Sequence, residues 1–317
     1  MKHSFIDTNG IKLHVVELGE GPAVLFCHGF PGTWRGWRRQ MLATAAAGFR
    51  AISMDMRGYG QSDAPRAAEN YTVLHSVGDL VGLLDALSLP TAILVGHDFG
   101  ANIVWNAALM RPDLFTAVFG ISVPFTPRGE KSVLGQMAEA GHHDFYMFDR
   151  ILPEADELWS DAETMIPANL YWSSAAAPKG ERWTLFNRKL PKYRTLPAPL
   201  PSWVDHDDLR QEIADFLKTG FNGALNYYRA MQLSFELLAP FKGKLVQQPS
   251  FFLGGAEDGL VKIAGPQNSA GQKKYLPGIV DSVIIPDVGH WPQLEASEQT
   301  NAALLEFLTD LRQKGIS

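Results

Sequence analysis

Short segments expected to form strands alternate with longer segments of helical periodicity along most of this 317-residue chain. The expected strands lie at residues 4–8, 11–18, 23–27, 50–54, 91–95, 117–123, 250–253 and 282–285. The expected helices lie at residues 33–47, 73–87, 101–110 and 297–312. From the third strand onward the strands are apolar along their whole length, which is typical of a parallel sheet covered by helices on both faces. The pattern therefore predicts an α/β fold with a mostly parallel sheet.

The alternation stops after Pro124 and resumes only at the strand expected near residue 250. The intervening stretch consists of short helical pieces interrupted by prolines and rich in tryptophan and tyrosine. We expect residues 126–237 to form a helical cap, inserted after the sixth strand into one core made of residues 1–125 and 238–317. An aromatic-rich insertion of this kind suits the cover of a ligand pocket.

The composition argues against several kinds of partner. The chain has 28 Lys and Arg against 34 Asp and Glu, and no basic stripe that could follow a nucleic-acid backbone. No stretch reaches the roughly 18 uninterrupted apolar residues of a membrane span, and the N-terminus has no apolar signal region. The single cysteine, Cys27, excludes an intramolecular disulfide and is expected to be a buried small side chain. We expect a cytoplasmic protein, either monomeric or homodimeric.

The segment Gly96-His97-Asp98-Phe99-Gly100 lies directly between an expected strand and an expected helix. It has the form Gly-x-nucleophile-x-Gly, a tight turn that raises one side chain above the sheet. Glycines on both sides let neighbouring chain segments approach closely, and the helix N-terminus offers N–H groups to an anion. An aspartate that only caps the helix is the simpler alternative, but the context on both sides favours Asp98 as a nucleophile.

Two later loops supply the partners that such a nucleophile needs, in the chain order nucleophile, acid, histidine. Glu257 and Asp258 follow the strand expected at residues 250–253, and His290 follows the last expected strand. We predict that His290 is the general base and that Asp258 orients it, with Glu257 as the alternative acid. A lone loop histidine is usually structural, so the catalytic interpretation depends on the joint occurrence of all three positions.

The segment His28-Gly29-Phe30-Pro31 follows the strand expected at residues 23–27. A loop at this place can direct a backbone N–H toward the elbow and complete an oxyanion hole with the amide of the residue after the nucleophile. The predicted donors are therefore the amides of Phe30 and Phe99. The peptide bond before Pro31 can be cis, although X–Pro bonds are usually trans. Four side chains are expected to line the substrate pocket: His28, Pro31, Trp34 and Trp291.

Several segments resemble those of the soluble epoxide hydrolases of microbes and plants, a family with the α/β-hydrolase fold. They are HGFPGTWRGWRRQM, MDMRGYGQSDAP, VGHDFGA, SVPFTPR and TGFNGALNYYR, at residues 28–41, 54–65, 95–101, 122–128 and 219–229. The resemblance covers nearly the whole chain, and its cap segment is the most specific part. It implies a hydrolase that acts on the ether bond of an epoxide and yields a vicinal diol through an ester on Asp98. It also implies a small-molecule epoxide substrate, with no cofactor and no metal.

The same resemblance implies that two cap tyrosines bind the epoxide oxygen and donate a proton to it. Tyr228 matches the second of them well, and Tyr146 best matches the first. Downstream of Tyr146 the family often continues with Phe-Gln-x-Pro-Gly, whereas this chain has Asp149-Arg150-Ile-Leu-Pro.

A carboxylate nucleophile suits attack on a saturated carbon, which leaves two other functions to weigh. Haloalkane and haloacid dehalogenases use the same aspartate, but a tryptophan or, in fluoroacetate dehalogenases, an arginine usually follows it, where this chain has Phe99. A non-catalytic ligand-binding protein could keep the fold, because fold alone does not determine function. The joint presence of Asp98, Asp258 and His290 argues against that alternative, and Asp98 itself argues against a serine esterase.

Overall fold

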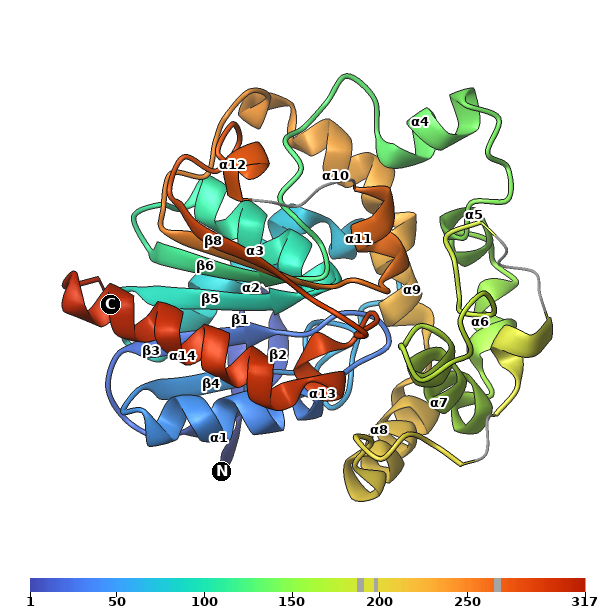
Figure 1. Cartoon of the computed structure of the whole chain (residues 1–317), viewed down its shortest axis with the longest axis horizontal. Helices are drawn as coiled ribbons and strands as arrows, with labels where there is room; N and C mark the ends of the chain where they lie inside the picture. Colours follow the sequence, from blue (N-terminus) through green and yellow to red (C-terminus); the bar gives the residue numbers. More distant parts are fainter. Residues whose placement is uncertain (187–190, 197–198, 265–268, 317) are drawn as a thin grey trace.

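The computed structural model describes residues 1–186, 191–196, 199–264 and 269–316. An eight-stranded sheet runs through its centre in the order β1-β2-β4-β3-β5-β6-β7-β8 (Figure 1). The strands are β1 (Lys2–Thr8), β2 (Ile11–Leu18), β3 (Ala23–Cys27), β4 (Arg50–Met54), β5 (Ala92–His97), β6 (Phe115–Ile121), β7 (Ser250–Gly255) and β8 (Ile279–Ile285). β1 and β4 are antiparallel to β2, and every pair from β4 to β8 is parallel. The predicted mostly parallel sheet is confirmed.

The two faces of the sheet contact two different hydrophobic clusters. In β3, Val24 and Phe26 belong to one cluster, whereas Leu25 and Cys27 belong to the other. Side chains of a strand point alternately to opposite faces, so both faces of this strand are buried. The first cluster is covered by α1 (Arg38–Ala46) and α14 (Ser297–Gln313), and the second by α2 (Val73–Ala86) and α3 (Phe99–Met110). Cys27 is free and buried, as predicted.

Helices follow one another without a strand between β6 and β7 in the described part of the chain. They are α4 (Val133–Glu139), α5 (Met147–Arg150), α6 (Ala155–Trp159), α7 (Ala162–Trp172), η3 (Pro191–Arg194), α8 (His206–Thr219), α9 (Asn222–Arg229), α10 (Met231–Leu237) and η4 (Ala239–Phe241). α5 to α9 form a separate layer beside one edge of the α/β core (Figure 1). We call residues 126–237 the cap and the rest the core, and these limits stay a prediction.

The remaining short helices lie in loops of the core. They are η1 (Trp34–Trp37), η2 (Ala68–Tyr71), α11 (Gly259–Ile263), α12 (Ser269–Gln272) and α13 (Pro292–Glu295). The helix expected at residues 33–47 is divided into η1 and α1, because Thr33 caps a 3-10 turn with its side chain before the α-helix begins. β8 begins at Ile279, earlier than expected, because Ile279 pairs with Ser250 of β7.

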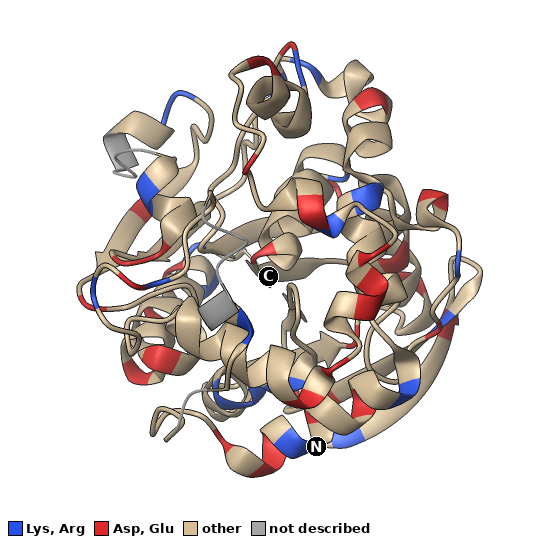
Figure 2. Cartoon of the chain, turned by 90° about the vertical axis from the view of Figure 1, so that its right-hand side faces the viewer, with Lys and Arg blue, Asp and Glu red and all other residues tan. Residues whose placement is uncertain are grey.

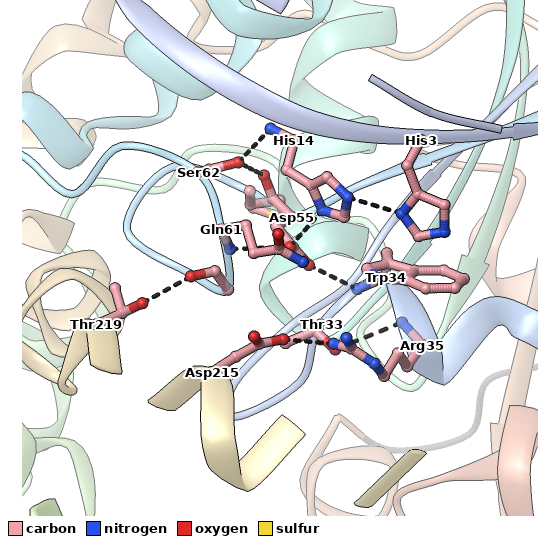
Figure 3. Close-up of polar contacts among 12 residues, drawn as sticks. His3, His14, Thr33, Trp34, Arg35, Asp55, Gln61, Ser62, Asp215 and Thr219 are labelled. Carbon is pink, nitrogen blue, oxygen red and sulfur yellow. Dashed lines mark hydrogen bonds and ion pairs between the residues drawn. The ribbon is translucent and has the colours of Figure 1, made fainter. Parts of the chain in front are cut away.

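Polar contacts hold the cap helix α8 against two loops of the core (Figure 3). Arg35 Nη1 donates to Asp215 Oδ2 at 2.5 Å, and Thr219 Oγ1 donates to the Gly60 carbonyl at 2.6 Å. Buried Asp55 joins the same two loops, because its carboxylate accepts the amides of Trp34 and Gln61. The chain segment after β3 therefore carries both Phe30 and Arg35, which binds the cap helix α8.

The charges on the cap side of the molecule are mixed in sign. Lys and Arg are interspersed with Asp and Glu there, and neither sign forms a continuous stripe in this view (Figure 2). No helix within the described ranges combines the length and the apolar character needed to cross a membrane.

Candidate active site

Asp98 occupies a tight turn between β5 and α3. Its backbone has φ +53° and ψ −120°, a conformation that non-glycine residues rarely adopt. A Cβ on Gly100 would lie 2.0 Å from the Cys27 carbonyl oxygen, and one on Gly96 would lie 2.4 Å from the Gly100 oxygen. Only glycine fits at these two positions, so the flanking glycines make the turn possible. The predicted nucleophile elbow is confirmed as a structural feature.

The two carboxylate oxygens of Asp98 have different partners. Oδ1 accepts the Phe30 N–H at 2.9 Å, whereas Oδ2 lies 3.6 Å from His290 Nε2. Phe99 is the first residue of α3, and the first N–H groups of a helix have no acceptor within that helix. The two predicted oxyanion donors thus lie on the two chain segments that meet at Asp98. The peptide bond between Phe30 and Pro31 is cis.

His290 contacts Asp258 on the side away from Asp98. Its Nδ1 lies 3.0 Å from Asp258 Oδ2, and the other oxygen of this fully buried carboxylate accepts the Leu260 N–H at 2.8 Å. That second contact caps α11 and holds the carboxylate in place. Glu257, the alternative acid, pairs instead with Arg182 at 2.6 Å and with Lys262 at 2.7 Å, so the geometry favours Asp258.

The charges at the site keep His290 protonated in the free protein. Burial lowers the pKa of His290, but the carboxylates of Asp258 and Asp98 outweigh this effect and raise its pKa to about 10. Burial likewise acts to raise the pKa of Asp98, yet the contact with His290 and the Phe30 amide bring it down to about 2. An ester on Asp98 would remove one of the two carboxylates and so lower the pKa of His290. A general base needs this change, because only neutral imidazole can accept a proton.

The loop that carries His290 has supports that sequence reasoning missed. His97 Nε2 and Ser122 Oγ both donate to the His290 carbonyl, at 2.7 and 3.0 Å. The His290 N–H donates to the Ser173 carbonyl of the cap at 3.0 Å. The Glu295 carboxylate accepts the amides of both residues that flank His290. The available signal was the position of His97 inside the elbow motif. Ser122 and Ser173 come from distant parts of the chain, whereas Glu295 lies on α13, close to His290 in the sequence.

The cap brings the two predicted tyrosines together. Tyr146 and Tyr228 are both buried, and their ring centroids are 6.2 Å apart at an interplanar angle of 83°. The Tyr228 ring lies 4.6 Å from the Phe99 ring and 5.4 Å from the Phe30 ring. Burial raises the pKa of both phenols above their usual value, so both are protonated and able to donate at neutral pH. Tyr228 therefore contacts both residues whose amides flank Asp98, and Tyr146 packs against Tyr228.

Arg150 is a further cap residue in this cluster, and its part in the site was not predicted. Its Nη1 donates to the Tyr228 hydroxyl oxygen at 2.6 Å. Its guanidinium carbon lies 4.3 Å from the Phe30 ring centroid and 4.8 Å from that of Trp159. The departure from the family pattern after Tyr146 falls at this position and was the available signal.

A cavity of about 390 Å³ has both Asp98 and Tyr146 in its wall. Most of the remaining wall is apolar and comes from α3, α10 and the segment after β6; it includes Phe99, Ile103, Leu109, Val123, Phe125, Met231, Phe235 and Leu238. The cavity runs between core and cap and reaches the nucleophile, so it is the candidate substrate pocket.

The four side chains expected to line this pocket lie elsewhere in the described structure, and that prediction is corrected. His28, Pro31 and Trp291 border a separate cavity of about 30 Å³. His28 Nε2 accepts the Met56 N–H there, which fixes the ring under the loop after β3. Trp34 packs its ring edge-on against His3, 5.2 Å away. Their loops do adjoin the elbow, but none of the four side chains borders the cavity that contains Asp98.

Comparison with known proteins identifies the family of this chain. Residues 22–297 match the family described as alpha/beta hydrolase fold. An epoxide hydrolase of Caballeronia sordidicola is 54% identical over 309 residues, which are 97% of this chain and 94% of that protein. This chain belongs to the epoxide hydrolase family.

Other members of the epoxide hydrolase family match equally completely. An epoxide hydrolase of Siraitia grosvenorii is 39% identical over 97% of this chain and 98% of its own length. The solved structure of an epoxide hydrolase from an endophytic Streptomyces superposes with a TM-score of 0.90, at 38% identity, and covers 98% of this chain and 96% of that one. The resemblance found in the sequence is confirmed, and these relatives lend no support to the dehalogenase alternative.

Proposed function

We propose that this epoxide hydrolase opens its substrate by attack of Asp98 on an epoxide carbon and releases a vicinal diol by hydrolysing the resulting ester. The arrangement of the Asp98 carboxylate carries this proposal. Oδ1 is held by the Phe30 amide, which leaves Oδ2 as the attacking oxygen beside His290. A carboxylate in this position can be alkylated and then attacked by water at its own carbonyl carbon.

The first step is ring opening. A bond forms between Asp98 Oδ2 and one epoxide carbon, the ring C–O bond breaks, and the electron pair remains on the epoxide oxygen. Tyr146 and Tyr228 hydrogen-bond to this oxygen, and one of them gives it a proton. General acid assistance of this kind contributes roughly 10²–10⁴-fold. The proton of His290 then restores the phenol, so the ester forms next to a neutral imidazole.

The second step is hydrolysis of the ester. His290 takes a proton from water, and the water oxygen attacks Asp98 Cγ. The amides of Phe30 and Phe99 stabilise the negative charge on Oδ1, and Asp258 stabilises the imidazolium. The Cγ–Oδ2 bond breaks, the diol leaves with Oδ2 and a proton from His290, and the new carboxyl group ionises by protonating His290. Epoxide and water are consumed, one diol is formed, and the free site is regenerated.

The pocket suggests the kind of epoxide that the site accepts. Its volume of about 390 Å³ and its largely apolar wall fit an epoxide on a hydrocarbon chain or ring system. In the proposed mechanism the polar groups that act on the reacting atoms are Asp98, His290, the two tyrosines and the oxyanion donors. None of the steps above uses a metal or a redox cofactor.

Oxygen-18 labelling tests the covalent route. With less than one equivalent of substrate in oxygen-18 water, we expect the first diol to be unlabelled and the label to appear in Asp98. Mass spectrometry of the diol and of the peptide that contains Asp98 measures both. Direct attack of water on the epoxide would label the diol at once and leave Asp98 unlabelled, and that result would disprove the nucleophile assignment.

A further inference from the structure

Arg150 is a buried cation without an anionic partner. Its exposed fraction is 8%, and none of the ion pairs found among the described residues includes it. Its guanidinium is surrounded instead by four aromatic rings, with centroid distances of 4.3 to 5.1 Å. Burial of an unpaired charge is costly, even though cation–π contacts offset part of that cost. The buried charge of Arg150 therefore suggests that the charge itself has a role in the site.

The contact with Tyr228 has only one possible direction. A guanidinium has donors and no acceptor, so Arg150 Nη1 donates and the Tyr228 oxygen accepts at 2.6 Å. The phenolic hydrogen of Tyr228 cannot point back at Arg150 and is left for another acceptor. In the substrate complex, the epoxide oxygen is the acceptor that ring opening provides.

We propose that Arg150 is a positioning residue for ring opening, which directs the Tyr228 proton to the epoxide oxygen and stabilises the phenolate as that proton leaves. The inference rests on the proposed function. The Tyr228 O–H bond breaks, the proton forms a new O–H bond on the former epoxide oxygen, and the negative charge moves to the Tyr228 oxygen. That oxygen already accepts a hydrogen bond from the Arg150 cation, which strengthens as the charge develops.

This geometry also makes the two tyrosines unequal. Arg150 donates to Tyr228, whereas its contact with Tyr146 is with the ring, at 5.1 Å from the centroid. A phenolate at Tyr228 is therefore stabilised more than one at Tyr146. Tyr228 is accordingly the proton donor, and Tyr146 is the second hydrogen-bond donor to the epoxide oxygen.

The test is Arg150→Met, which removes the charge and keeps an unbranched side chain. Rapid quench and mass spectrometry follow formation and decay of the Asp98 ester in single turnovers. We expect ester formation to slow about 10- to 100-fold, the worth of one hydrogen bond to a charged group, while the substrate concentration that half-saturates the single turnover and the rate of ester decay stay unchanged. A side chain that only packs the cap would alter both steps or the melting temperature alone.

Combining Arg150→Met with Tyr228→Phe distinguishes a positioning role of Arg150 from a general structural role. In Tyr228→Phe the oxygen that accepts from Arg150 is gone, so Arg150→Met should add little to the loss. Equal losses in the two backgrounds would overturn the inference. Arg150→Lys keeps a cation among the rings, so its rate of ester formation should fall less than that of Arg150→Met. If Arg150→Met does not fold, the Lys variant is compared in the wild-type protein and in Tyr228→Phe.

Arg229→Met is the matched control. Arg229 follows Tyr228 on α9 and pairs with Asp156 at 2.5 Å, so it joins cap helices without contacting the phenol. We expect a lower melting temperature and normal ester formation. If the wild-type protein forms no ester on Asp98, the proposed function fails; if it does and Arg150→Met forms the ester equally fast, only the inference about Arg150 fails.

Discussion

The core half and the cap half of the active site are built in different ways. In the core, Asp98, Asp258 and His290 each follow the end of a parallel strand, and hydrogen bonds to backbone groups hold them. In the cap, Tyr146 and Tyr228 lie among packed aromatic rings and share one buried cation. The strand ends thus hold the nucleophile and the base, whereas the packing of short helices positions the acid.

The two chemical steps also depend differently on the core and the cap. Ring opening needs the core carboxylate and the cap phenols together, whereas ester hydrolysis needs only the core. Substitutions of the cap phenols should therefore slow ring opening, whereas substitution of the core base His290 should slow ester hydrolysis. The predictions below test that division.

The largest effect is expected for His290→Ala. Loss of the general base should lower turnover by about 10⁴-fold or more, while the ester still forms and accumulates. Mass spectrometry should then show an adduct on the peptide that contains Asp98. Asp98→Ala in the same background is the control and should show no adduct. Normal turnover, or an adduct on another peptide, would contradict the assignment.

A smaller effect is expected from the cap. Tyr146→Phe and Tyr228→Phe should each slow ester formation, within the roughly 10²–10⁴-fold range of general acid assistance, and the double change should nearly abolish it. Ester decay, measured in the same single turnovers, should stay normal. Tyr171→Phe is a control, because Tyr171 is a cap tyrosine on α7 whose ring contacts Trp172. Full activity of the double variant would remove both phenols from the mechanism.

The pH dependence of the two steps sharpens the comparison further. The pKa of His290 is raised to about 10 in the free site by Asp258 and Asp98 together, against the effect of burial. Ester formation neutralises Asp98, so the pKa of His290 falls and neutral imidazole becomes available at lower pH. We expect the midpoint of ester decay to lie below the pH at which His290 titrates in the free protein, as measured by NMR. Asp98→Asn, which mimics the neutral ester, should show the same lowered titration, and an unchanged titration would refute this account.

The smallest effect concerns the junction between the halves, where Thr33 Oγ1 donates to Glu212 Oε1 of α8 at 3.0 Å. Burial raises the pKa of Glu212 from near 4.5 to about 7. Because the folded pKa is above the unfolded one, this group's stabilising contribution is complete below about pH 4.5 and is lost as pH rises through 7. Glu212→Gln should therefore raise the melting temperature, relative to the wild type, more at pH 8 than at pH 5. Glu163→Gln, at an exposed position of α7, should show no such difference.

The core half could be predicted because its signals are local. A turn that needs Gly96 and Gly100 around a nucleophile leaves few alternatives to Asp98, since a Cβ at either glycine would collide with backbone. Loops that follow parallel strands open at the same edge of the sheet, so Asp258 and His290 were expected near Asp98 from their order alone. These features follow from spacing and chain order, which a sequence contains in full.

Other features were decided only by tertiary structure. Glu257 and Asp258 are neighbours in the chain, and the choice between them follows from which carboxylate caps α11 and so faces His290. Arg150 and Tyr228 are 78 positions apart, and their contact exists because α5 and α9 pack together. The expected pocket walls were wrong for the same reason: the direction of a side chain on a loop depends on what packs around that loop. Sequence thus determined the fold, the family and the core half of the site, whereas packing between distant segments determined the partners and surroundings of the cap residues.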